Sequence, residues 1–122
     1  MREADSRPQL DHERLDVYQI ALQFQSLVPA LAPRRGYAAL RAQIERASAS
    51  VLLNIAEGAG RFGRADKAQF YRVARGSALE CAAVLDIFLS RGLLADSVHG
   101  ASRGLLVRVA QMLTRLVRAM ER

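Results

Sequence analysis

Apolar residues recur at intervals of three and four positions in four segments of the chain, which is the spacing of an amphipathic helix face. Short stretches containing proline or glycine separate these segments. The pattern predicts helices over residues 15–31, 38–58, 65–90 and 98–120. Because short connections make successive helices antiparallel neighbours, we expect an all-α fold, an antiparallel up-down-up-down four-helix bundle.

The apolar stripes also predict which side chains form the core. The first helix is expected to use a stripe formed by Leu15, Tyr18, Leu22, Gln25 and Val28, widened by the neighbouring residues Val17, Ala21, Phe24 and Leu31. The third helix is expected to use one face formed by Phe70, Val73, Ala74, Ser77, Cys81, Val84, Leu85 and Phe88. Leu53 and Leu79 lie off the core stripes of their helices, and a second apolar flank is typical of a helix that packs against another subunit. We therefore expect a homo-oligomer.

A chain of 122 residues is the size of one domain. Residues 1–12 lack an apolar period and are expected to form a flexible tail, with the bundle spanning residues 13–122. A single cysteine, Cys81, cannot form an intramolecular disulfide, and it is expected to be a buried, inert core residue. The sequence contains no apolar run long enough for a membrane span, which favours a cytoplasmic protein.

Positive charge is concentrated in the predicted bundle. Residues 17–122 contain fifteen basic and seven acidic residues, a net charge of +8, and 17 of the chain's 18 basic residues are arginine. One basic stripe runs along the fourth helix and a second cluster lies in the link before the third helix. The candidate nucleic-acid-binding residues are Arg61, Arg64, Lys67, Arg108, Arg115, Arg118 and Arg122. For any single arginine, a solvated surface role is the simpler interpretation, but the summed charge favours a polyanionic partner.

Four polar residues lie at helical intervals beside the expected core, namely Asn54, Glu57, Ser77 and Glu80. A hydrogen-bonded network that fixes helix register explains them best, because unpaired buried polar groups are costly. A ligand or metal site is the alternative, but neither glutamate is followed three positions later by a histidine, so we expect no metal, no cofactor and no catalytic residue. Gly76 lacks a side chain and is expected to allow two helices to approach closely.

The run Asn-Ile-Ala-Glu-Gly at positions 54–58, the segment Leu-Asp-Val-Tyr-Gln-Ile-Ala at 15–21 and the stretch from Ala74 to Glu80 together resemble a known family. These are the small bacterial four-helix-bundle proteins encoded within intervening sequences of 23S ribosomal RNA. The accessory variability protein of diversity-generating retroelements is similar. The resemblance implies a four-helix bundle, often assembled as a ring-shaped homopentamer. For the retroelement relative it implies a basic surface that binds nucleic acid and a reverse transcriptase.

Charge and resemblance together predict a non-enzymatic accessory protein that contacts RNA or DNA phosphates with little sequence readout. Phe62 is the one aromatic residue among the basic ones, so we expect base stacking to contribute little. The alternative is an interaction scaffold whose basic ring docks an acidic protein such as a polymerase or reverse transcriptase.

Overall fold

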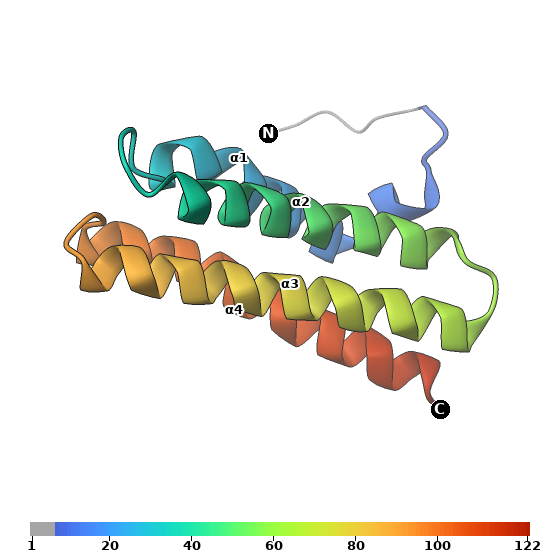
Figure 1. Cartoon of the computed structure of the whole chain (residues 1–122). Coiled ribbons are helices and arrows are strands. Elements are labelled where there is room, and N and C mark those ends of the chain that lie inside the picture. Colours follow the sequence, from blue (N-terminus) through green and yellow to red (C-terminus); the bar gives the residue numbers. More distant parts are fainter. Residues whose placement is uncertain (1–6) are drawn as a thin grey trace.

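A computed structural model describes residues 7–122 of the chain and contains four helices (Figure 1). These are α1 (Asp16–Leu31), α2 (Ala38–Gly60), α3 (Arg64–Ser90) and α4 (Asp96–Met120), and a 3-10 turn, η1 (Asp11–Arg14), precedes them. No strand occurs within the described range. The prediction of an all-α four-helix bundle is confirmed, and the predicted helix bounds agree with the observed ones to within two residues.

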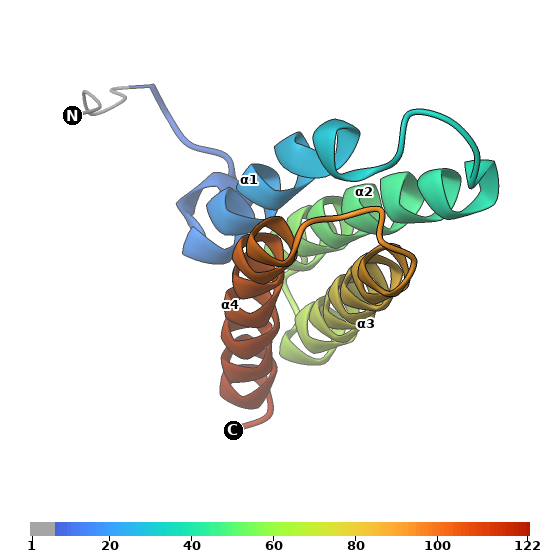
Figure 2. The ribbon, with the colours of Figure 1, turned by 90° about the vertical axis from the view of Figure 1, so that its left-hand side faces the viewer.

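Successive helices run in opposite directions. The α1–α2 and α3–α4 links lie at one end of the bundle, and the α2–α3 link lies at the other end together with the C-terminus of α4 (Figure 1). Figure 2 views the bundle from the end that carries the α1–α2 and α3–α4 links. From this end, α1 lies next to both α2 and α4, and α3 closes the bundle between α2 and α4. This topology therefore brings the α2–α3 link and the end of α4 close together.

The core is a single apolar cluster to which every helix contributes. The predicted face of α1 is only partly right, because its flanking members Val17, Ala21 and Phe24 are buried whereas Leu22 of the expected stripe is 41% exposed. On α3 most predicted members are buried as expected, namely Ala74, Cys81, Val84, Leu85 and Phe88. The prediction is wrong at the start of that face, where Tyr71 is buried while Val73 is 43% exposed. Apolar residues flank both stripes, so the spacing alone permits either face to turn inward.

The close approach between helices occurs at Gly58 and not at Gly76. A Cβ atom on Gly58 would lie 2.8 Å from Cε1 of Tyr71, whose ring packs across the end of α2. Gly76 has open space around the position of its missing Cβ atom. The prediction that Gly76 allows two helices to approach is wrong, because this residue lies on the exposed side of α3.

The segment before α1 is partly ordered against the bundle. Of the tail predicted over residues 1–12, residues 1–6 lie outside the described residues, and the predicted boundary at residue 12 falls inside η1. The Glu13 carboxylate accepts a 2.8 Å hydrogen bond from the amide of Leu10. The His12 ring packs edge-on against Tyr18 with 4.6 Å between the ring centroids. The turn η1 therefore belongs with the bundle.

Candidate functional site

The outward side of α4 carries the predicted basic stripe. Leu106, Val109 and Leu113 of this helix are buried, and the arginines at 108, 115 and 118 lie on the opposite, exposed side. Within residues 7–122, none of these three guanidinium groups forms a hydrogen bond or an ion pair. These three side chains therefore stand unpaired in the described part of the chain and are exposed to solvent.

The basic cluster before α3 has a different character, because its side chains bind backbone carbonyls and a carboxylate of the same molecule. Lys67 Nζ donates hydrogen bonds to the carbonyl oxygens of Ala59 at 2.8 Å and Gly58 at 3.3 Å, which closes the C-terminus of α2. Arg61 donates to Glu57 Oε2 at 3.2 Å, and its guanidinium lies 4.7 Å from the centroid of Phe70. These two residues stabilise the end of α2.

Arg64 connects this cluster to the end of α4. Its guanidinium donates to the carbonyl oxygens of Ala119 at 3.2 Å and Arg122 at 3.4 Å. Carbonyls in the last turn of a helix lack intrahelical partners, so a cation there is stabilising. The two predicted basic groups thus meet at one end of the bundle, although they are 58 residues apart in sequence at Arg64 and Arg122.

The predicted polar network is only partly present. The hydroxyl oxygens of Ser50 and Ser77 lie 2.8 Å apart across the α2–α3 contact, and Asn54 donates to the Ser50 hydroxyl at 3.1 Å and to the Ser50 carbonyl at 2.9 Å. These three side chains form a hydrogen-bonded register between helices.

The two glutamates differ in their relation to this network. Glu80 is exposed at the edge of the α2–α3 contact and accepts a 3.3 Å interhelix hydrogen bond from Gln43, whereas Glu57 is exposed and pairs with Arg61. The prediction of a register-fixing polar residue is therefore wrong for Glu57, and Glu80 fills that role from the exposed edge and not from the interior. A carboxylate at the edge of a helix interface reaches solvent with little displacement, whereas burial would carry a desolvation cost.

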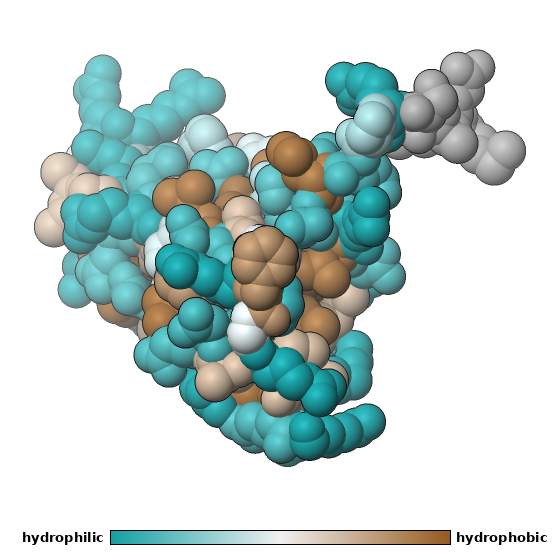
Figure 3. All heavy atoms as spheres, turned by 90° about the vertical axis from the view of Figure 1, so that its right-hand side faces the viewer, coloured by the Kyte–Doolittle hydropathy of each residue, from teal (hydrophilic) through white to brown (hydrophobic). Residues whose placement is uncertain are grey.

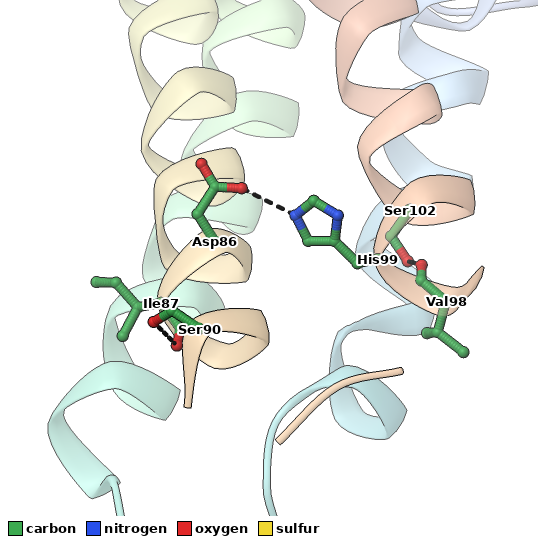
Figure 4. Close-up of polar contacts among 6 residues, drawn as sticks. All are labelled: Asp86, Ile87, Ser90, Val98, His99 and Ser102. Carbon is green, nitrogen blue, oxygen red and sulfur yellow. Dashed lines mark hydrogen bonds and ion pairs between the residues drawn. The ribbon is translucent and has the colours of Figure 1, made fainter. Parts of the chain in front are cut away.

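A histidine–carboxylate pair that the sequence analysis missed joins α3 to α4 (Figure 4). His99 Nε2 lies 2.8 Å from Asp86 Oδ1, and the His99 side chain is 14% exposed. The buried Ser102 hydroxyl, one turn further along α4, donates to the Val98 carbonyl at 2.8 Å instead of to the imidazole. The pair therefore links the start of α4 to α3. The Ser102 hydroxyl is not hydrogen-bonded to the imidazole, so the pair does not activate it as a nucleophile. Only the bundle's register brings these residues together, so no local pattern identifies them.

Other reactive groups are few. The Cys81 thiol is fully buried, as predicted, and burial together with the neighbouring Glu80 charge raises its pKa from 9.0 to about 12. Across residues 7–122, no group of three or more His, Cys, Asp or Glu side chains is arranged to hold a metal ion. In the same range, no helix has both the length and the apolar character needed to cross a bilayer.

Comparison with known proteins identifies a family and a similar fold. The family described as 23S rRNA-intervening sequence protein matches residues 13–115. A crystal structure from Bacteroides thetaiotaomicron, described as a protein of unknown function from the S23 ribosomal protein family, is similar with a TM-score of 0.77. The two sequences are 18% identical, and the alignment covers 84% of this chain and 95% of the other. No curated protein matches the chain.

Proposed function

The chain belongs to the 23S rRNA-intervening sequence protein family, and from this premise we propose that it is a non-enzymatic accessory protein whose basic surface binds RNA or DNA phosphates. The observation that supports this best is the row of unpaired, exposed guanidinium groups at Arg108, Arg115 and Arg118. Arginines spaced along one helix face contact successive phosphates and read little sequence. The binding unit is a homo-oligomer, which multiplies the charge, and the family resemblance sets five subunits as the expected number.

The basic stripe on α4 supports phosphate binding better than the basic cluster before α3 does. Lys67 and Arg64 already donate to carbonyl oxygens, so a phosphate would have to compete with internal hydrogen bonds. The three α4 arginines bind no other group within the described residues and lose only hydration when they contact a phosphate. We therefore expect Arg108, Arg115 and Arg118 to supply most of the phosphate contacts, with Arg61, Arg64 and Arg122 adding long-range attraction.

The test measures binding of a fluorescein-labelled single-stranded RNA by fluorescence anisotropy between about 50 and about 200 mM salt. Replacing Arg108, Arg115 and Arg118 together by Ala should weaken binding and reduce the slope of log K against log salt by about 2–3. The matched control replaces Arg34, Arg35 and Arg46 by Ala. These three residues are also exposed, so their replacement removes the same charge from another part of the surface. Equal losses in the two triple variants would contradict a specific role for the stripe.

An acidic protein partner, such as a polymerase or reverse transcriptase, is the competing outcome. In that case the purified chain would show no affinity for RNA or DNA even at low salt. Its association with the protein partner would survive nuclease treatment.

A further inference from the structure

The link between α2 and α3 holds an aromatic side chain entirely in solvent. Phe62 is 101% exposed, whereas the other exposed large apolar residues range from 39% to 66%. Gly60 and Gly63 stand on either side of it and bring no side chain that could cover the ring. Both faces of the ring are thus accessible.

A surface hollow of about 860 Å³ lies beside the ring. Its apolar part is formed by Leu53 and Ala56 on the outer side of α2, and Phe62 contributes to one wall. The charged side chains in the remainder are the paired Arg61 and Glu57, together with Asp66. Figure 3 looks at this end of the molecule and shows apolar side chains at the centre of the face, with hydrophilic ones surrounding them. A flat aromatic ligand with polar edges fits such a lining.

Three basic and two acidic residues lie between positions 57 and 67, and this positive balance around the hollow favours a nucleic acid as the occupant. Arg61 and Arg64 flank Phe62 in sequence, and the hydrogen bonds from Arg64 to the end of α4 bring Arg122 to the same end. Two copies of this end facing each other would repel, whereas a phosphate chain would be attracted. Proteins that bind single strands combine these features, with cations along the backbone and an aromatic ring under a base.

Resting on the proposed function, and against the expectation from the sequence that base stacking contributes little, we propose that Phe62 is a stacking platform for an unpaired nucleobase. The protein then prefers single-stranded or looped segments to duplex. The base lies on the Phe62 ring and against the Leu53 side of the hollow, and Arg61 and Arg64 attract the adjacent phosphates. In a duplex the base faces are already stacked on one another and are closed to Phe62. The α4 stripe contacts phosphates in either form, whereas Phe62 contributes only with unpaired bases.

The decisive experiment uses the absence of tryptophan from the sequence. Phe62→Trp provides a single fluorophore, and titration with unlabelled single-stranded RNA should quench its emission, while duplex RNA of the same length should not. Leu22→Trp, which places the fluorophore at an exposed site on α1, is the control and should respond to neither. In parallel, Phe62→Ala should weaken single-strand binding about tenfold and leave duplex binding unchanged.

Three outcomes would overturn the inference while leaving phosphate binding intact. Phe62→Ala could weaken both forms equally, Phe62→Trp could give no quenching on single-strand binding, or Phe62→Ala could lower the mass seen by light scattering. The last result would identify Phe62 as a subunit contact. Loss of binding in the Arg108, Arg115 and Arg118 triple variant with no change in Phe62→Ala would support the proposed function alone. If the unmodified protein binds neither form, both proposals fail.

Discussion

At the scale of single residues, Gly58 sets the distance between α2 and α3. A Cβ atom there would lie 2.8 Å from one carbon of the buried Tyr71 ring and 2.9 Å from another, so the ring or a helix would have to move. Gly58→Ala should therefore lower the free energy of unfolding by about 1–3 kcal/mol, measured by urea denaturation. Gly76→Ala is the matched control, because the site is open and alanine favours helix, and it should raise stability by about 0.5–1 kcal/mol. Changes of the same sign would contradict this geometry.

The Cys81 thiol makes stability depend on alkaline pH. Its pKa is raised from 9.0 to about 12 in the fold, so near pH 7 the thiol is protonated in both the folded and unfolded states. Above pH 9 the unfolded chain loses this proton while the folded chain keeps it, and unfolding becomes more favourable by up to about 1.4 kcal/mol per pH unit until about pH 12.

Cys81→Ala isolates this contribution, since every other titrating group is shared. The free energy of unfolding of the unmodified protein should fall more steeply above pH 9 than that of the variant. Urea titrations below and above that pH measure the difference. Parallel pH profiles would show that the thiol ionises in the folded state as readily as in the unfolded one.

Residue spacing predicted some of these contacts and not others. Ser77 was assigned to an interhelix hydrogen bond correctly, because a small hydroxyl beside an apolar stripe has few other partners. Glu57 follows Asn54 by three residues, a helical spacing that would place it in the network. Its carboxylate instead pairs with Arg61, one turn further on. Its long side chain can turn either inward or outward, and the choice depends on solvation that periodicity does not encode.

At the scale of helices, Lys67 stabilises the link between α2 and α3, although its charge alone suggests a phosphate-binding residue. It lies in the first turn of α3 and closes the last carbonyls of α2, so the link between the helices is held at both sides. Glycines near the end of α2 and a nearby cation were a usable signal, because terminal carbonyls need donors. The sequence analysis instead grouped Lys67 with the phosphate-binding residues.

Two substitutions separate these roles. Lys67→Met keeps the length of the side chain and removes its donors, and should lower the free energy of unfolding by about 1 kcal/mol with a small loss of RNA affinity. Arg108→Met, at an exposed site without an internal partner, should do the reverse and reduce affinity at unchanged stability. Thermal unfolding and anisotropy measure the two effects. A stability loss confined to Arg108→Met would refute this assignment.

Helix existence and length followed from the sequence, but the exact rotation of α1 did not. In α1, apolar residues occupy both the predicted stripe and the one beside it, so Leu22 and Ala21 satisfy the period equally well. The packing of α1 against α2 and α4 decides between them, and it buries Ala21. The rotation of a helix with a wide apolar face is fixed by its neighbours, which local spacing cannot identify.

At the scale of the whole molecule, topology assembles the charged end. In the sequence, the α4 stripe and the link cluster are separate basic groups. An up-down-up-down bundle places the ends of α2 and α4 on the same side, and the Arg64 hydrogen bonds to Ala119 and Arg122 fasten them together. The combined surface is therefore a consequence of the fold, and no single helix pattern contains it.

The exposed side of α3 bears on the proposed homo-oligomer. Val73 and Leu79 are 43% and 48% exposed there, and the open position at Gly76 lies between them in sequence. Exposed apolar side chains on one side of a helix favour contact with another subunit. The surface carries the exposed carboxylate of Glu80, and on its Leu79 side it borders α4 in a groove that Arg103 and Gln111 also line.

Replacing Val73 and Leu79 together by Glu should therefore dissociate the oligomer, because burying two carboxylates against an apolar partner is unfavourable by several kcal/mol. Light scattering should give about five times the 13.4 kDa chain mass for the unmodified protein and a smaller mass for the variant. Leu22→Glu, at a similarly exposed apolar site on α1, is the control and should keep the full mass. Dissociation should also weaken RNA binding even though every arginine is retained, because each bundle then presents its charge alone. An unmodified protein of single-chain mass would exclude the oligomer, whereas dissociation by Leu22→Glu would place the contact on α1.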